Sequence, residues 1–380
     1  MKKKSSGFRL QIWFAVSFFP FLLLGVDQGR AEERKSNPRA KWEETVRKAD
    51  KEGKLSIYMS RGGEFYKIIR AFHKEYPKIR VNLVTGGGHY ASRILSERRA
   101  NKYLADLVVT GPGSPYYILY RGKFLDPIKP TLILPEVADP SKWWRGKHHY
   151  IDPEDKYVFV FMGPVSAGYV YYNSNQVKPS EFKSYYDLLK PKWRGKLLME
   201  DPRAPGSARL GLRVIYNLPE LGPKFLRRLF EEMDITLVRD RRQSVDWLAV
   251  GKYPICIFCS DGRYAKAQGL PVDEFRTVEW LKQPAVAPGG TSTMALLNRA
   301  PHPNAATVFI NWMLSRKGQT TLQDVLNPTG RVYESMREDI PKDIIPTERR
   351  RQKGVDYIMM ATPTRSDNVP PAKLLKQIIR

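Results

Sequence analysis

Helical and strand patterns alternate over residues 37–113, and this alternation constrains the fold more than any other feature of the chain. The connections are short, and one helical pattern places Phe65, Ile68 and Phe72 on a single face. The expected elements are helices at 37–52, 63–77 and 90–104 and strands at 55–60, 79–85 and 105–110. Because parallel strands need a crossover helix between them, this order predicts an α/β fold in which helices cover both faces of a parallel sheet.

Each of these expected strands runs into small, polar residues. The three runs are Ser-Arg-Gly-Gly at 60–63, Thr-Gly-Gly-Gly at 85–88 and Thr-Gly-Pro-Gly at 110–113. In open parallel sheets, ligands bind beyond the carboxyl ends of the strands, where glycines let the backbone approach them closely. Glycine-rich turns are also common without a ligand, but three in register predict a binding cleft at this edge.

The second half of the chain repeats this organisation. The expected segments are a β-rich run at 157–173 with a Gly-Pro break, a strand at 196–200, a loop at 201–206, a helix from Ser207, a strand at 253–259 with a polar exit at 260–263, and a strand at 293–297. Residues 331–380 are rich in proline and charge, and we expect an irregular or short helical wrap there.

The first 31 residues have the three-part organisation of a cleaved export signal. Basic residues at 2–4 and 9 precede an apolar run at 10–26, and Gly29 and Ala31 supply the small residues that a signal peptidase reads. A membrane anchor is the alternative, since the run approaches spanning length. Pro20 and the small residues favour cleavage, so we expect a periplasmic or secreted protein, and the absence of a cysteine near the cut argues against a lipoprotein.

Length and charge narrow the function classes. The remaining chain is longer than one hydrophobic core usually holds, so we expect two lobes and a monomer. The formal charge of +25 is compatible with an acidic solute, an anionic envelope surface, nucleic acid or simple solubility. No zinc-finger spacing or RNP-type aromatic run is present, so nucleic acid is not an expected partner.

Cysteines and histidines give no metal motif. Cys256 and Cys259 are the only cysteines, and they lie in an apolar, β-favouring run. Because alternate strand residues face opposite sides, we expect two buried thiols, with a disulfide or redox pair as the alternative. The five histidines show no helical metal-ligand spacing, so neither a metal site nor a cofactor is expected.

Four stretches together resemble the extracellular solute-binding proteins of ABC importers, most closely the ferric-iron-type branch. They are EGKLSIYMS at 52–60, the ER.A..Y.ADL pattern at 97–107, SYYDLLKPKWRGKLLMEDPR at 184–203 and APHPNAATVFINWMLSRKGQ at 300–319. The resemblance spans about residues 40–330 and implies the type II periplasmic-binding-protein fold, in which two α/β lobes are joined by two crossing hinge strands.

The same resemblance implies which residues form each lobe and where the chain crosses between them. The crossings should fall near 163–168 and 288–293. Residues 32–165 and 290–380 would form the first lobe, and residues 166–289 the second. A small solute would bind between the lobes and pass to an ABC permease in the inner membrane, without catalysis.

The ligands of bare ferric ion do not carry over from this branch. Its ferric members have an adjacent tyrosine pair where this chain has Ser260-Asp261, a histidine in the loop that here reads Arg61-Gly62-Gly63, and a glutamate in the loop that here reads Thr110-Gly111-Pro112. We therefore expect a small anion, and ferric or chelated iron remains the alternative.

Hydrogen-bond donors occupy or flank the positions that hold the metal ligands in the ferric members. Arginine presents a planar fork that suits carboxylate or phosphate, and the helix start at Ser207 adds partial positive charge. The alternative for Arg203 is a salt bridge to Asp201, with Ser207 a plain helix cap. The predicted ligand-binding residues are Ser60, Arg61, Gly62, Gly87, Gly88, Thr110, Gly111, Ser166, Ala167, Arg203, Gly206, Ser207, Ser260, Asp261, Arg263, Gly290 and Thr291.

Three rival functions stay open. An enzyme on the same fold is not favoured, because no nucleophile elbow, His-Glu-x-x-His or P-loop motif occurs. A sensor that hands its closed form to a membrane receptor would have the same sequence features. A basic envelope-surface protein would bind polyanions in a salt-sensitive way.

Overall fold

The computed structural model describes residues 37–59, 62–86, 89–166, 168–204, 206–329 and 332–379. The predicted export signal at 1–31 lies outside these residues. Within the described segments, every helix is too short or too polar to cross a membrane.

The first sheet has seven strands, and it contains the predicted β-α-β-α-β unit. The strands are β1 (Lys54–Met59), β2 (Arg80–Thr85), β3 (Leu107–Thr110), β4 (Leu125–Asp126), β5 (His149–Tyr150), β6 (Val158–Val160) and β14 (Thr293–Leu297). Their order is β2-β1-β3-β14-β6-β5, with β4 also paired to β14. β1 is parallel to β2 and β3, whereas β14 is antiparallel to β3 and β6. The α/β prediction is confirmed for this half of the chain.

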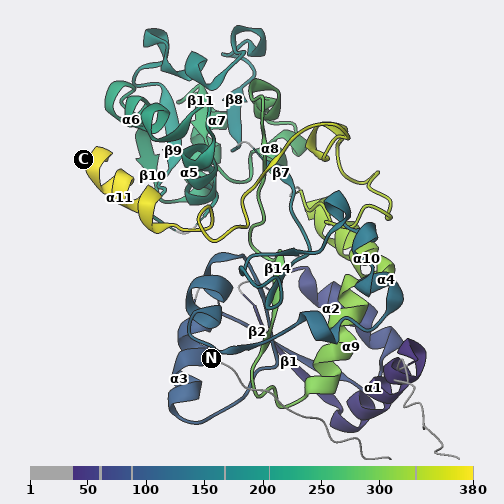
Figure 1. Ribbon diagram of the computed structural model, residues 1–380. Coiled ribbons are helices and arrows are strands. Elements are labelled where there is room, and N and C mark those ends of the chain that lie inside the picture. Colours follow the sequence, from purple (N-terminus) through teal and green to yellow (C-terminus); the bar gives the residue numbers. More distant parts are fainter. Residues whose placement is uncertain are drawn as a thin grey trace, which may run out of the picture. The chain divides into compact units, whose positions relative to one another are not determined.

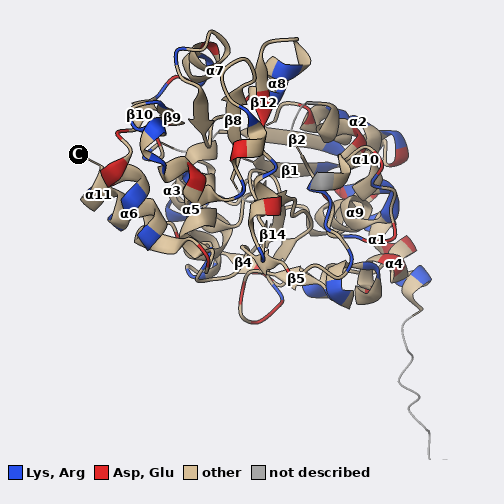
Figure 2. Cartoon of the chain, turned by 90° about the horizontal axis from the view of Figure 1, so that it is seen from above, with Lys and Arg blue, Asp and Glu red and all other residues tan. Residues whose placement is uncertain are grey.

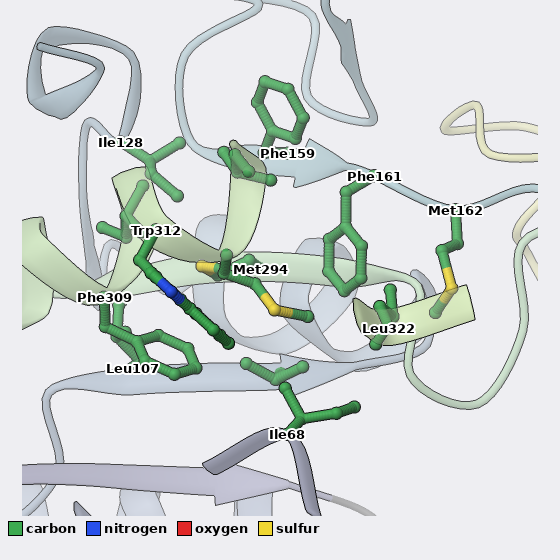
Figure 3. Close-up of a cluster of buried hydrophobic side chains, with 14 of the residues drawn as sticks. Ile68, Leu107, Ile128, Phe159, Phe161, Met162, Met294, Phe309, Trp312 and Leu322 are labelled. Atoms are coloured by element: carbon green, nitrogen blue, oxygen red, sulfur yellow. The ribbon is translucent and has the colours of Figure 1, made fainter. Parts of the chain in front are cut away.

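Side-chain alternation explains why helices cover both faces of this sheet. On β1, Ile57 packs into one core and Tyr58 into the core on the opposite face. The helices of this half are α1 (Pro38–Glu52), α2 (Phe65–Glu75), α3 (Tyr90–Arg99), α4 (Pro135–Ala138), α9 (Pro303–Leu314) and α10 (Arg316–Leu326). Helices α1, α2, α9 and α10 lie on one side of the sheet and α3 on the other (Figure 1). Phe309 and Trp312 of α9 belong to the larger core (Figure 3).

The second sheet has five strands in the order β10-β9-β11-β8-β12. They are β8 (Val170–Asn173), β9 (Leu197–Glu200), β10 (Thr236–Val238), β11 (Ile255–Ile257) and β12 (Val272–Glu274). β9 is parallel to β10 and β11, and β8 runs antiparallel to β11 and β12. The helices are α5 (Ser207–Asn217), α6 (Gly222–Glu232), α7 (Arg241–Ala249), α8 (Gly262–Ala267) and α11 (Val369–Ile378). Alternation again gives two cores, because Met199 and Leu198 lie in different clusters.

Short helices connect these elements. They are a π-helix at Pro115–Tyr120 and 3-10 helices at Lys129–Thr131, Pro140–Lys142, Trp144–Gly146, Pro179–Glu181, Tyr185–Leu189, Pro191–Trp193, Thr277–Trp280, Asn327–Thr329 and Thr347–Arg349.

A third, small sheet contains the segments that pass between the two large ones. It consists of β7 (Val165–Ser166), β13 (Ala285–Val286) and β15 (Ile358–Met359), and β13 is antiparallel to β7 and parallel to β15. The chain leaves the first sheet after β6, passes β7 and enters β8, as predicted for 163–168. It returns through β13, a few residues before the predicted 288–293.

The C-terminal segment makes a third passage that the sequence did not predict. After β15 the chain reaches α11, whose Leu374 and Leu375 pack with α5 and α6 in a core of the second sheet (Figure 1). The predicted lobe limits, 32–165 with 290–380 and 166–289, stay a prediction. However, the assignment of all of 290–380 to the first lobe does not describe residues 358–378, because apolar residues of this segment are buried in the second sheet's core.

Buried ion pairs anchor this segment to the first crossing. Glu334 is fully buried and pairs with Lys342 at 2.9 Å and with Arg351 at 3.2 Å. Arg351 also donates to the carbonyl oxygen of Gly163 at 2.5 Å. The expected irregular wrap is therefore held by an ion network in which Glu334 and Arg351 are buried and the Lys342 side chain is 17% exposed.

Candidate functional site

The carboxyl edge of the first sheet brings four predicted site residues together. The carbonyl oxygen of Thr110, at the end of β3, accepts hydrogen bonds from the Ser292 amide at 3.1 Å and the Thr293 hydroxyl at 2.8 Å. These bonds bring the adjoining Thr291 to the same edge. Gly111 lies so close to Gly290 that a Cβ atom on Gly111 would stand 3.4 Å from the Gly290 nitrogen. The Gly111 and Gly290 backbones are therefore neighbours at this edge.

Two tyrosines at this edge were missed by the sequence analysis. Tyr90 opens α3, and burial raises the pKa of its phenol while the hydroxyls of Thr110 and Ser114 bond to it. Tyr66 is half-exposed, and its ring lies against Gly62, where a Cβ atom would stand 2.8 Å from it. Each tyrosine lies within three residues after a glycine-rich run, Tyr66 after Gly63 and Tyr90 after Gly88, and this proximity could have indicated them.

At the second sheet, Arg203 forms the salt bridge that the sequence left as its alternative. Its Nε and one terminal nitrogen donate to the two carboxylate oxygens of Asp201 at 2.9 and 2.8 Å. The hydrogen bonds from Arg203 hold the pKa of Asp201 below its usual value. Asp201 is nearly buried, whereas the Arg203 side chain is 52% exposed, and Arg239 stands 3.7 Å from the same carboxylate.

Two of the predicted site residues, Ser207 and Ser260, lie next to each other at the start of α5, beside a carboxylate that was not predicted. Glu200, the last residue of β9, is 5% exposed. It accepts hydrogen bonds from the Ser260 amide at 2.5 Å and the Ser260 hydroxyl at 3.0 Å. The Ser260 and Ser207 hydroxyl oxygens are 2.9 Å apart. Gly206 directly precedes the helix, and a Cβ atom there would stand 3.9 Å from Glu200 Oε2.

Arg263 is neutralised by a pair that involves the C-terminal segment. Its Nε donates to Glu274 at 2.7 Å, and Arg349 pairs with the other oxygen of Glu274. Both guanidinium groups lie over the ring of Tyr169, at 5.7 and 5.0 Å from its centroid. Burial, with a smaller contribution from Arg263, lowers the pKa of Arg349 to about 10. The distance along the chain between Glu274 and Arg349 explains why no local pattern predicted this contact.

The loop that carries Ser260 and Asp261 is closed by a disulfide between Cys256 and Cys259, so the prediction of two free thiols was wrong. The strand ends at Ile257, and Phe258 has a positive φ of 56°. This left-handed residue breaks the strand alternation, so both cysteines lie in the same buried cluster. Asp261 also has a positive φ, of 58°.

Replacing both cysteines by alanine should lower the free energy of unfolding by about 2 kcal/mol, because the bridge closes only a short loop. Urea unfolding of the C256A/C259A variant against the oxidised wild type measures this. Wild-type protein treated with dithiothreitol in urea and refolded with its thiols reduced should reproduce the loss. Two titratable thiols in unreduced, denatured wild type would contradict the assignment.

The remaining predicted residues fall into two groups. Ser166 lies in β7 of the small sheet, where its hydroxyl accepts from the Gly168 amide at 3.3 Å, so it is not at the edge of either large sheet. Ser60, Arg61, Gly87, Gly88 and Ala167 lie outside the described residues.

Charges of both signs are interleaved at the edge of the second sheet. The guanidinium groups there belong to Arg203, Arg239, Arg241, Arg263 and Arg349, and the carboxylates to Glu200, Asp201, Asp261 and Glu274. Basic and acidic positions alternate in this way over much of the chain (Figure 2). Among the described residues, no three His, Cys, Asp or Glu side chains gather closely enough to hold a metal ion.

Comparison with known proteins identifies the second half of this arrangement. Residues 159–324 match the family model described as bacterial extracellular solute-binding protein. This part of the chain is similar to bacterial extracellular solute-binding domains. The match to the solute-binding family runs from β6 to α10, so it includes the first two crossings and all strands of the second sheet. No curated protein sequence matches the chain.

Solved structures of solute-binding proteins share the fold across most of the chain. Iron-bound HitA from Pseudomonas aeruginosa is 19% identical with a TM-score of 0.62, over 86% of this chain and 99% of that one. The Trichodesmium IdiA (FutA) complex with iron and citrate is 20% identical with a TM-score of 0.60, over 86% and 99%. AfuA from Actinobacillus pleuropneumoniae with bound fructose-6-phosphate is 18% identical with a TM-score of 0.56, over 86% and 97%. The chain thus has the two-lobed α/β fold of periplasmic binding proteins.

Proposed function

We propose that this protein is exported to the periplasm, captures a small anionic solute between its two lobes and delivers it to an ABC permease. The observation that carries the proposal is the solute-binding domain at 159–324, with hydroxyl and guanidinium groups at the carboxyl edge of its sheet. The first sheet contributes the backbone groups around Gly111 and Gly290.

Hinge closure supplies the mechanism, and periplasmic binding proteins are a standard example of it. The solute bridges both lobes and so favours the closed form. A shift from mostly open to mostly closed needs roughly 5.5 kcal/mol of differential affinity. Hydrogen bonds to charged groups contribute roughly 1.5 to 3 kcal/mol each, so two to four bridging contacts are enough.

Arg203 is the most accessible cation for this purpose. Its side chain is half-exposed, and only two of its five N–H groups bind Asp201, so the others can bind a solute anion while the ion pair stays intact. Arg239 adds a second positive charge 3.7 Å from the same carboxylate. Arg263 is less available, because its side chain is only 22% exposed and Glu274 already binds it.

An anionic metal chelate is the second candidate solute. The Trichodesmium relative holds iron together with citrate, and a citrate complex presents carboxylates to the same guanidinium groups. A chelate does not require the protein to supply metal ligands of its own. A protein that binds the chelate only with iron, and not free citrate, would distinguish this candidate from a simple anion.

A thermal-shift screen of carboxylates, phosphates, sugar phosphates and iron chelates tests the proposal. A solute that binds only the folded protein stabilises it, by about 2.7 kcal/mol at a hundred times its dissociation constant. At least one anion in the screen should raise the melting temperature. A response to neutral sugars alone would contradict the anionic assignment.

Arg203→Ala should weaken binding of the anion with the largest shift by about tenfold to a hundredfold, the value of one hydrogen bond to a charged group. Isothermal titration calorimetry measures the change. Arg242→Ala is the matched control, because it removes an equal charge from a side chain that is 91% exposed and pairs with Asp246 on the same helix. Affinity within twofold of wild type in R203A would exclude Arg203 from the site.

A further inference from the structure

Glu200, Ser260 and Ser207 form a continuous hydrogen-bonded chain that ends at the first residue of α5. The Glu200 carboxylate receives both the amide and the hydroxyl of Ser260, and the Ser260 hydroxyl oxygen is 2.9 Å from that of Ser207. Glu200 and Ser260 are buried, whereas Ser207 is partly exposed at the carboxyl edge of the sheet. The chain therefore leads from a buried acid to the surface that faces a solute.

The protons available on Glu200, Ser260 and Ser207 determine which group donates in each hydrogen bond. Each serine hydroxyl has one proton to donate, and an ionised carboxylate only accepts. With Glu200 ionised, Ser260 donates to Glu200, and Ser207 in turn donates to Ser260. The Ser207 oxygen then has only lone pairs to offer to a solute.

Protonation of Glu200 at Oε2 reverses the two hydrogen bonds that the serine hydroxyls make, whereas the Ser260 amide still donates to Oε1. The carboxylic acid then donates to the Ser260 oxygen, Ser260 donates to Ser207, and the Ser207 proton points away from the chain. In this state Ser207 can donate to an anionic oxygen, beside the free amides of the first turn of α5.

We propose that the relay Glu200–Ser260–Ser207 determines which polarity of solute group binds at the start of α5. With Glu200 ionised the relay selects a hydroxyl or ammonium donor, and with Glu200 protonated it selects an anionic oxygen. This inference rests on the proposed function and refines it. At neutral pH the solute is an anion that also carries hydroxyl or amine groups, with the donor group at Ser207 and the charge at Arg203.

Several charged groups act on the relay. Burial is the main influence on Glu200 and raises its pKa, the hydrogen bonds from Ser260 and the charge of Arg241 on α7 lower it, and Asp261 raises it further. The reversal therefore occurs above the ordinary glutamate value of 4.5. Oxyanion binding at α5 should be strongest in acid and weaken as the pH rises through the pKa of Glu200.

Sulfate is the probe, because it stays a dianion between pH 4.5 and pH 8. A pH dependence of its binding therefore comes from the protein and not from titration of the ligand. Calorimetry at pH 4.5 and pH 8 should show sulfate binding about tenfold tighter at the lower pH in the wild type, the value of about one hydrogen bond to a charged group. Glu200→Gln is the decisive variant, since the amide accepts from the Ser260 amide and donates to the Ser260 hydroxyl. It fixes the reversed direction, so E200Q should bind sulfate at pH 8 about as tightly as the wild type does in acid, with no pH dependence.

Asp261→Asn is the matched control. It removes one carboxylate close to Glu200 but leaves all three members of the relay, so its pH dependence should persist.

The outcomes separate this inference from the proposed function. Sulfate affinity that is equal at both pH values, absent at both, or still pH-dependent in E200Q overturns the relay. If another anion from the thermal screen binds normally in those cases, solute capture stands and only the relay fails. If E200Q behaves as expected but no physiological solute closes the lobes, the relay stands and the transport role fails.

Discussion

Glu334→Ala should lower the free energy of unfolding by about 3–5 kcal/mol, the loss typical when one partner of a buried ion pair is removed. The substitution leaves the side chains of Lys342 and Arg351 next to an empty position in a region closed to water. Burial already lowers the pKa of Lys342, so this lysine can lose its proton to reduce the cost. Arg351 stays charged, and its backbone amide also loses the bond to Glu334.

Urea unfolding of E334A and the wild type at the same pH measures this effect. Glu338→Ala is the matched control: Glu338 is exposed and close in the sequence, so its removal should change stability by no more than about 0.5 kcal/mol. The triple variant E334L/K342M/R351M removes all three charges and should recover much of the loss, because apolar replacement of a buried ion network is often neutral. Equal stabilities of E334A and E338A would show that the network does not hold the C-terminal segment.

The sequence predicted the large sheets well, because side-chain alternation and helical periodicity are local properties. Ile57 and Tyr58 on β1, like Leu198 and Met199 on β9, are sorted onto opposite faces by the strand period alone. The glycine-rich run at 110–113 likewise ends a strand at the edge where Thr110, Gly111 and Gly290 lie together.

The predictions that were wrong depend on contacts between residues distant in sequence or on the backbone angle of a single residue. Arg263 was expected to be a free donor, but Glu274 and Arg349 fix it, and a composition-based reading of residues 331–380 gives no partner for Arg349. The disulfide was missed because one left-handed residue, Phe258, reverses the facing of Cys259. Such a conformation is uncommon for phenylalanine, so no propensity argument could have placed it.

The acidic part of the candidate site was missed for another reason. Donors are the groups that suit an anion, and Glu200 is the last residue of a predicted strand. In the fold its carboxylate accepts two hydrogen bonds from Ser260, whose hydroxyl also contacts Ser207. A carboxylate at the end of a strand, beside a loop that carries a serine, indicates a binding site as much as the arginines do.

A second large effect is expected from His149, which lies in β5 below the ring of Trp144. The two rings stack with centroids 5.2 Å apart, and His149 Nε2 is 2.8 Å from the Trp144 carbonyl oxygen. A carbonyl only accepts, so Nε2 carries the proton in the neutral ring. Burial is the main influence and lowers the pKa of His149 to about 4, with Lys147 and Arg351 adding to the effect.

The sign of the pH dependence follows from this lowered pKa. An unfolded histidine titrates at about 6.5, so between about pH 6.5 and pH 4 the unfolded chain binds a proton that the folded protein refuses. The stabilisation from a neutral His149 is fully present above pH 6.5 and is lost as the pH falls towards 4. The loss amounts to about 3 kcal/mol, or at most about 1.4 kcal/mol per pH unit.

Urea unfolding at several pH values between 4.5 and 7.5 tests this expectation in the wild type and in His149→Phe. The phenylalanine ring keeps the stacking on Trp144 but has no proton to bind, so H149F should be less stable at pH 7.5 and show a flatter decline in acid. His148, whose pKa burial also lowers, contributes equally to both proteins, and so do the carboxylates. The control is His73→Gln at an exposed position, where the slope should match the wild type. Parallel slopes in H149F and the wild type would show that folded His149 binds a proton as readily as an unfolded histidine, which would contradict the lowered pKa.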